Sequence, residues 1–335
     1  MSTAISRAPR IAPLLAAILS LAVASCAIDP GIRLEHQYRS GLVEDSQLAF
    51  FAEDAAAVTT RQALRLKGPV ESTTVELMHA SESTPGSPLR SALRWHLKLD
   101  EHGMAKSWYI ESFTDKDEKL SLTWEHTYGR ADRPELPTLS TLHATSDAIR
   151  GDKPIEIARD YDERGQLIRV RTGLGETSRE HRVIERAADG RVEAIKYHVN
   201  QWVGGGPPGD MNPPVVHAYD ESGRVTKVSE GESTTFTATW EGNAKVTFAH
   251  PNKRFQLQSA EFDEHGSLKS WVMYASVNPG RTDPASTIKA SNEIEYDDRG
   301  NWTRIRTRWS GKDVDGIAFD RPFQEIVRTI VYREE

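Results

Sequence analysis

Alternation of apolar and polar residues recurs along most of this chain and predicts many short β-strands. Residues 70–78 alternate and are rich in Val and Thr, which suits a strand with one buried face. Segments of the same texture follow, with turn residues between them, at 91–99, 105–112, 119–127, 154–161, 167–173, 180–186, 191–199, 214–220, 224–229, 234–240, 245–249, 254–262, 268–275, 292–297, 302–309 and 323–332. This number of strands excludes an α/β fold and predicts an all-β, antiparallel one.

Several joints between these segments share one pattern: Asp, an acidic residue, any residue, Gly. The joints are Asp100–Gly103, Asp162–Gly165, Asp220–Gly223, Asp263–Gly266 and Asp297–Gly300. An Asp that opens a turn can accept a hydrogen bond from the backbone two residues on, and the Gly can take positive φ and align the returning strand. An aromatic residue before the Asp, as at Tyr296, is expected to close the incoming strand against its neighbour. We interpret these Asp and Gly residues as structural turn residues of β-hairpins.

Two of these units are closer in sequence than turn chemistry requires. Residues 100–108 and 263–271 agree at seven of nine positions, which indicates internal duplication. A hairpin repeat buries its apolar face only against neighbouring repeats, so we expect one curved sheet over residues 68–335, an open barrel or a spiral. Tight acidic turns would lie along one edge of it. Longer connections rich in Pro, Gly and Ser would lie along the other, at 81–90, 130–153, 204–214, 278–287 and 311–322.

A helical segment is expected ahead of the sheet. Residues 47–67 are rich in Ala, Leu, Gln and Arg, which favour helices. The neighbouring sequence is poor in such residues. We therefore predict a short helical cap over residues 47–67 that packs on the edge of the sheet.

The amino terminus has the features of an export signal. Arg7 and Arg10 precede an apolar run over residues 11–24, too short for a comfortable membrane span. The run ends Val23-Ala24-Ser25-Cys26, which resembles the bacterial lipobox. That resemblance implies removal of residues 1–25 and acylation of Cys26, with palmitate or a similar chain, ahead of a tether over 26–46. Ala27 in place of Asp implies sorting to the outer membrane, facing the periplasm or the cell surface. The alternatives are an ordinary signal peptide with a chance Cys and a short anchor helix.

The Tyr-Asp-x-x-Gly units resemble YD repeats, the units of RHS-type proteins. The best matches begin at Tyr161, Tyr219 and Tyr296, and the resemblance covers residues 63–333. It implies a protein built from β-hairpins. Large RHS proteins form a shell around a toxin, but this chain is too short for a closed shell and has no cargo domain, so we do not transfer that role.

The charge balance and the cysteine content exclude some classes of partner and of covalent crosslink. The net charge is −7, and removal of residues 1–25, which contain Arg7 and Arg10 and no acid, leaves 40 basic and 49 acidic residues. That balance argues against nucleic acid, which requires clustered cations. Cys26 is the single cysteine, so one chain has no internal disulfide. We recognise no catalytic or cofactor motif and expect neither a cofactor nor a metal. The acidic turns offer hard ligands for Ca²⁺, but each supplies too few of them.

Candidate partner-binding residues remain. His102 and His265 each follow an Asp-Glu pair, which could serve a general base, but their matching repeat positions favour inherited turn residues. Most of the Trp residues lie in predicted strands and are expected in the core. Trp202 is the exception, because it precedes a Gly- and Pro-rich loop that contains Asp210. Arg304, Arg306 and Arg308 share one face of a strand, either to hold a polyanion or to pair with acids such as Glu293 and Glu295.

The function that we expect is non-catalytic. The first hypothesis is a lipid-anchored cell-envelope protein that binds a protein or a glycan through its long loops. The second is an enzyme that acts on envelope glycan, for which the sequence offers only exposed carboxylates. The third is an immunity or accessory protein for an RHS-type toxin, which rests on resemblance alone.

Overall fold

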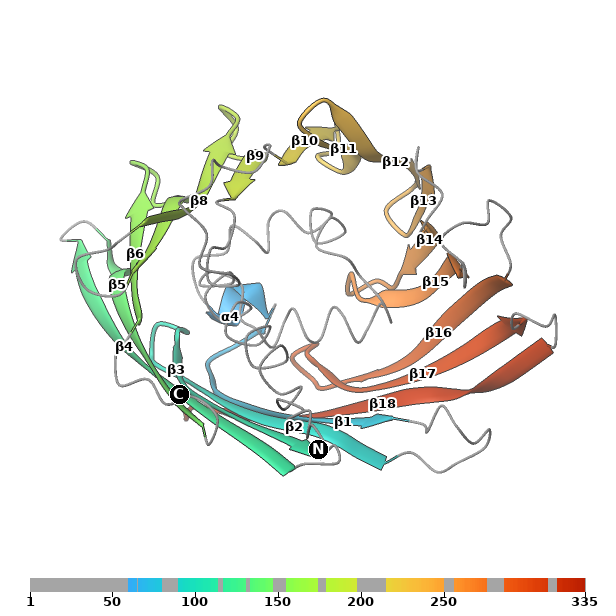
Figure 1. Ribbon diagram of the computed structural model, residues 1–335, viewed down its shortest axis with the longest axis horizontal. Coiled ribbons are helices and arrows are strands. Elements are labelled where there is room, and N and C mark those ends of the chain that lie inside the picture. The colour runs from blue at the N-terminus through green and yellow to red at the C-terminus, as the bar shows by residue number, and fades with distance from the viewer. Residues whose placement is uncertain are drawn as a thin grey trace, which may run out of the picture.

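Eighteen antiparallel strands form a closed barrel (Figure 1). The structure is a computed structural model, and it describes residues 60–64, 66–79, 90–113, 117–130, 133–146, 155–173, 179–197, 215–249, 256–275, 286–312 and 318–334. The strands are β1 (Val70–His79), β2 (Arg90–Leu99), β3 (Ala105–Phe113), β4 (Asp117–Arg130), β5 (Arg133–Ser146), β6 (Ile155–Tyr161), β7 (Leu167–Gly173), β8 (Arg179–Arg186), β9 (Val192–Tyr197), β10 (Val215–Tyr219), β11 (Val225–Glu230), β12 (Ser233–Glu241), β13 (Lys245–Ala249), β14 (Gln256–Phe262), β15 (Leu268–Ala275), β16 (Ser286–Tyr296), β17 (Trp302–Lys312) and β18 (Ala318–Tyr332).

The barrel closes where the last strand meets the first. Each strand pairs with its successor, and β18 pairs with β1 from Val70 opposite Tyr332 to His79 opposite Gln324. The all-β prediction is confirmed, whereas the prediction of an open sheet is wrong. Alternation along a strand fixes which side chains share a face, but it carries no information on whether the two end strands meet, and closure removes both unpaired edges.

The inward face of the wall is largely apolar. Val75 in β1 lies opposite Trp95 in β2, and Leu97 lies opposite Trp108 in β3, and all four side chains are buried. Their sequence neighbours Arg94 and Lys98 are exposed and point the other way. The same register continues around the barrel to a second buried cluster on β11–β16 (Val225, Val228, Phe236, Ala238, Val246, Phe248, Ala260, Trp271 and Ala290). The period-two pattern thus becomes an apolar interior and a polar exterior.

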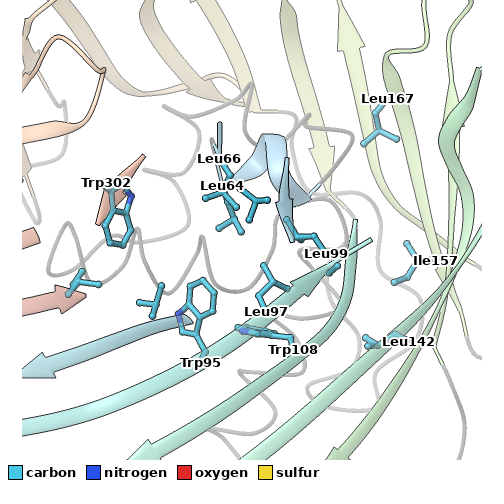
Figure 2. Packing of buried hydrophobic residues seen from close by; sticks show 14 of the residues in the cluster. Leu64, Leu66, Trp95, Leu97, Leu99, Trp108, Leu142, Ile157, Leu167 and Trp302 are labelled. Atoms are coloured by element: carbon cyan, nitrogen blue, oxygen red, sulfur yellow. The ribbon is translucent and has the colours of Figure 1, made fainter. Parts of the chain in front are cut away.

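A short helix lies inside the ring. Helix α4 (Thr60–Ala63) is followed by Leu64 and Leu66, which join the buried cluster of the wall. Figure 2 shows these two leucines beside Leu97 and Trp95 of β2. The prediction that residues 47–67 form a cap on the sheet edge is therefore wrong about where the helix packs, because a closed barrel has no edge to cover. Residues 47–59 of that prediction lie outside the described residues.

Strand β5 is absent from the sequence prediction, which has a loop over residues 130–153. Pro134 and Pro137 argue against a strand at this position, because proline lacks the amide hydrogen that a residue of a central strand donates. The structure accommodates Pro137 at an irregularity, where the register with β4 shifts between Thr127 and Tyr128. The Pro137 carbonyl then accepts the hydroxyl hydrogen of Tyr161 at 2.7 Å.

The two ends of the barrel differ. Because the strands run alternately up and down, all five Asp-acidic-x-Gly turns fall at one end, together with the start of β1 and the end of β18. We call this end the tight-turn rim. The connections β1–β2, β9–β10, β15–β16 and β17–β18 fall at the opposite end, the long-loop rim. The fifth connection predicted to be long, over 130–153, is mostly strand β5.

Candidate functional site

The turns of the tight-turn rim contain the hydrogen bonds that their sequence predicts. In the first turn, Oδ1 of Asp100 accepts from the backbone N–H of His102 at 3.0 Å and from that of Met104 at 2.9 Å. Oδ1 of Asp297 accepts from the N–H of Arg299 and of Asn301 at 3.0 and 2.8 Å. The other three turns have the same pair of bonds. One carboxylate oxygen of each Asp is therefore committed to its own turn.

In three of these Asp residues, the second carboxylate oxygen accepts a hydrogen bond from a tyrosine of the following repeat. The hydroxyls of Tyr128, Tyr296 and Tyr332 donate to Oδ2 of Asp100, Asp263 and Asp297, respectively. Tyr219 instead donates to the Val192 carbonyl. The sequence interpretation missed these bonds, although Tyr recurs at a spacing close to that of the repeat. The tyrosines thus join one hairpin to another across the rim.

Ionisation of Asp297 strengthens its hydrogen bond to Tyr332. Partial burial opposes the charged form, but the Tyr332 hydroxyl and the N–H groups of Asn301 and Arg299 outweigh it and hold the pKa of Asp297 below its usual value. Burial and the Asp297 carboxylate together raise the pKa of Tyr332 to about 12.

A pH-dependent contribution to stability follows from the lowered pKa. It is present above the ordinary Asp pKa of about 4 and is lost as pH falls through the lower pKa of the folded state. Wild type is therefore expected to lose its advantage in Tm over Asp297→Asn on acidification from pH 6 to pH 2. Thermal melts of both proteins across that range measure it, and a constant difference in Tm would contradict the assignment.

The two predicted histidines occupy equivalent places. His102 lies over the Tyr128 ring with centroids 4.4 Å apart, and His265 lies over the Tyr296 ring at 4.2 Å. Each also lies near the glutamate that precedes it, with the closest atoms 3.5 and 3.8 Å apart. These duplicated contacts hold the tyrosines in place, which supports the interpretation of both histidines as turn residues.

Arginines connect further turns of the same rim. Arg133 donates to the Arg164 carbonyl at 3.2 Å, and Arg164 donates to the Ala188 carbonyl at 2.8 Å. Arg191 reaches the Asp220 carbonyl at 3.4 Å, and Arg224 reaches that of Gly242. Each bond runs from one hairpin to the next. These four arginines thus join neighbouring turns of the rim to one another.

Two duplicated glycines allow a matched test of the turns. Gly103 and Gly266 both have positive φ, but a Cβ on Gly103 would lie 2.9 Å from the Cβ of Arg61, whereas one on Gly266 would meet nothing within 4 Å. The left-handed backbone costs a non-glycine residue about 1–2 kcal/mol. Chemical denaturation should therefore show that loss for Gly266→Ala and a larger loss for Gly103→Ala. Equal losses would contradict the contact between Arg61 and this turn.

A buried relay on the inward face most resembles a catalytic dyad. The Ser140 hydroxyl lies 2.7 Å from Nδ1 of His126 and accepts from Arg159 at 2.6 Å. Nε2 of His126 lies 2.6 Å from the Ala105 carbonyl oxygen. Burial first, and then Arg159, lower the pKa of His126, although the Ala105 bond opposes them. Ser140 is 0% exposed, so its hydroxyl cannot meet a substrate, and the relay satisfies buried polar groups of β3–β6.

The tryptophans predicted for the core are found there. Trp95, Trp108, Trp271 and Trp302 are buried, and Trp124, Trp240 and Trp309 pack against the two clusters. The indole N–H of Trp240 donates to the Val225 carbonyl at 2.8 Å. The prediction of core packing is confirmed for these seven. Cys26, Trp202 and Asp210 lie outside the described residues.

The three arginines of β17 lie on the polar exterior among acidic side chains. Arg306 contacts Glu293 at 3.5 Å and Glu295 at 2.9 Å, as the cross-strand alternative expected. Arg304 pairs with Glu325 at 3.2 Å, and Arg308 with Asp320 at 2.5 Å. These pairs compete with a polyanion for the same guanidinium groups.

Neither a metal-binding cluster nor a membrane-spanning helix is found in the described part of the chain. Within it, no three His, Cys, Asp or Glu side chains are placed to hold a metal ion. Within the same ranges, no helix is long and apolar enough to cross a membrane.

Comparison with known proteins gives a distant structural likeness. No family model matches the chain, and no curated protein matches it. Among solved structures, it is similar to a porin-like protein from Bacteroides uniformis, with 8% sequence identity and a TM-score of 0.41. That similarity covers 79% of this chain and 99% of the other.

Proposed function

We propose that this chain is a non-catalytic, lipid-anchored protein of the bacterial cell envelope that binds a protein or glycan partner at the long-loop rim. The contrast between the two rims carries the proposal. Side chains at the tight-turn rim bond the turns and hairpins to one another, whereas the opposite rim carries long Pro- and Gly-rich connections. Rigid scaffolds commonly present recognition loops in this manner.

Attachment to the membrane is proposed to run through Cys26. The supporting observation is the lipobox-like sequence that ends at Cys26, because acyl chains on that residue would hold the protein at a bilayer. In bacteria fed labelled palmitate, the protein is expected to carry the label and to fractionate with the outer membrane. Cys26→Ala is expected to lose both properties. Unchanged labelling of the variant would rule the anchor out.

The YD-repeat character of the chain belongs to the same proposal. It is supported by the shared geometry of the five turns and by the bonds from Tyr to a preceding Asp. Loss of cooperative unfolding after replacement of Tyr296 by Phe would fit a repeat array whose units depend on their neighbours.

The partner proposal has a direct experiment. The native lipoprotein, tagged after Glu335, is crosslinked in membranes and recovered. One dominant protein is expected, and its recovery should be lost when the connection over 202–214 is shortened but kept when that over 81–89 is shortened. Retention on peptidoglycan or lipopolysaccharide without a protein would assign a glycan ligand. Recovery of neither would contradict the proposal.

A further inference from the structure

The first acidic turn and the start of β3 hold helix α4 in place inside the barrel. The Arg61 N–H donates to the Gly103 carbonyl at 2.9 Å, and the Ala105 N–H donates to the Thr60 hydroxyl oxygen at 2.9 Å. The carbonyl oxygen of the same Ala105 lies 2.6 Å from Nε2 of His126. One backbone segment of the wall therefore contacts both the helix and the relay that His126 belongs to.

Each hydrogen bond of this relay has a fixed direction. A carbonyl oxygen only accepts, so Nε2 of His126 carries the hydrogen that is donated to Ala105. Nδ1 of the neutral ring then has a lone pair, which accepts from the Ser140 hydroxyl at 2.7 Å. The Ser140 oxygen in turn accepts from Arg159 at 2.6 Å. The relay therefore requires a neutral imidazole.

A proton on Nδ1 of His126 would disrupt this order. Nδ1 would direct a hydrogen at the Ser140 oxygen, and the Ser140 hydroxyl would lose its acceptor. The imidazolium would also share that oxygen with the Arg159 guanidinium, so that two cations would meet at a side chain that is 0% exposed. The charged ring is therefore more stable outside the relay than within it.

The charged groups around His126 do not remove this cost. Asp100 attracts the imidazolium, but one of its carboxylate oxygens accepts from its own turn and the other from the Tyr128 hydroxyl. Burial is the largest influence on the pKa of His126 and lowers it, and Arg159 adds to that effect, whereas the Ala105 bond and Asp100 oppose it. The remaining titratable groups placed at the first turn are Glu101, His102 and Arg61.

The duplicated copy of this turn lacks the relay. In both copies a tyrosine hydroxyl donates to the Asp that opens the turn. Two residues before that tyrosine, the first copy has His126 opposite Ser140, whereas the second has Ile294 opposite Ile305. A Cβ on the glycine of the first turn would lie 2.9 Å from the Cβ of Arg61 in α4, whereas one on the glycine of the second would meet nothing within 4 Å. The relay and the contact with α4 thus occur in the same copy, and the turn itself requires neither.

We infer that the relay of His126, Ser140 and Arg159 is an acid-sensitive latch, which holds α4 inside the barrel while the imidazole is neutral and releases the helix when the imidazole takes up a proton. Because the docked state binds fewer protons than the released state, docking is complete above the ordinary histidine pKa of about 6.5 and weakens as pH falls below it. The latch is separate from the proposed binding at the long-loop rim, because its groups lie near the opposite rim.

Hydrogen exchange of the full wild-type chain tests the latch. The N–H groups of Arg61, Leu64 and Leu66 are bonded in the docked helix. After correction for the chemical exchange rate at each pH, their protection should fall about tenfold between pH 7.5 and pH 5.0. An imidazole of ordinary pKa is about thirtyfold more protonated than neutral at pH 5.0, which sets the upper limit of the effect. Asp297 acts at lower pH, below the ordinary Asp pKa of about 4.

Variants of the relay make the result specific. His126→Gln keeps an N–H for Ala105 but does not titrate in this range, so its protection should be the same at both pH values. The matched control is His102→Gln, which removes the histidine of the same turn and should keep the tenfold fall. Arg159→Gln should show a smaller fall than wild type, because it removes the cation that opposes the imidazolium.

Three results would overturn the latch. They are wild-type protection that does not fall, an acid effect that persists in His126→Gln, and a fall that extends equally to residues 263–271 of the second copy, which would show general unfolding. If His126→Gln leaves α4 unprotected at both pH values, the comparison with Arg159→Gln decides, and a fall there as large as in wild type would contradict the latch.

Discussion

Replacing Trp108 with alanine is expected to cost about 3–5 kcal/mol of the free energy of unfolding. The side chain is 1% exposed on the inward face of β3, in edge-to-face contact with Trp95 at a centroid distance of 6.3 Å. Truncation leaves a cavity that neighbouring strands cannot fill, since each is held by its own ladder. Chemical denaturation of the two proteins measures the loss.

Two controls make that result specific. Trp108→Phe should cost much less, because the indole N–H of Trp108 has no hydrogen-bond partner among the described residues and its removal relieves a buried polar group. Lys106→Ala, an exposed position on the same strand, should change stability by no more than about 0.5 kcal/mol. If Trp108→Ala cost as little as Lys106→Ala, the inward face of β3 would not be part of a packed core.

Replacing Asn301 with alanine is expected to cost about 2–4 kcal/mol. Asn301 is 3% exposed, and its Oδ1 accepts from the Lys67 N–H at 2.7 Å. Its Nδ2 donates to the Lys67 carbonyl at 3.0 Å and to the Tyr332 hydroxyl at 2.6 Å. The side-chain amide of Asn301 thus joins the segment before β1 to the Asp297–Gly300 turn and to β18. Its loss leaves the N–H and the C=O of Lys67 without these bonds.

The comparison for this variant is Thr303→Ala, two residues along β17. Its hydroxyl donates to the Glu295 carbonyl at 3.3 Å in an exposed position, so its removal should change stability by no more than about 0.5 kcal/mol. Equal losses for the two variants in urea unfolding would show that Asn301 does not hold the first and last strands together.

The sequence supplies the strands of this fold because each depends on a local pattern. Seventeen of the eighteen strands were predicted from alternation, and the exception, β5, contains Pro134 and Pro137. The five acidic turns follow from two residues each, Asp and Gly, whose preferences act within four positions. The inward place of Trp108 and Trp271 follows from the same alternation.

Closure and the bonds between hairpins depend on contacts far apart in the chain. The pairing of β1 with β18 joins residues more than 200 positions apart, and no local pattern states which end strands meet. The helix-favouring composition of residues 47–67 indicates a helix, but not that Leu64 and Leu66 fill part of the barrel interior. The sequence does not predict the hydrogen bonds from Tyr hydroxyls to Asp263 and Asp297, because the turn alone accounts for each Asp.

The rims are the places where a partner is expected to bind, because the wall of the barrel is closed. A sheet with two unpaired edges would offer each edge to a partner, whereas this closed barrel leaves its two rims. The tight-turn rim is joined by tyrosine and arginine bonds between its turns.

Closure is tested most directly by a disulfide between the first and last strands. Thr74 in β1 lies directly opposite Thr329 in β18. In the chain with Thr74→Cys and Thr329→Cys, mild oxidation should link the peptides that contain these positions, as fully as in the hairpin control Ser270→Cys with Ser291→Cys. Mass spectrometry of the digested protein gives both yields. A link in the control with none between β1 and β18 would show an open sheet and contradict the closed barrel.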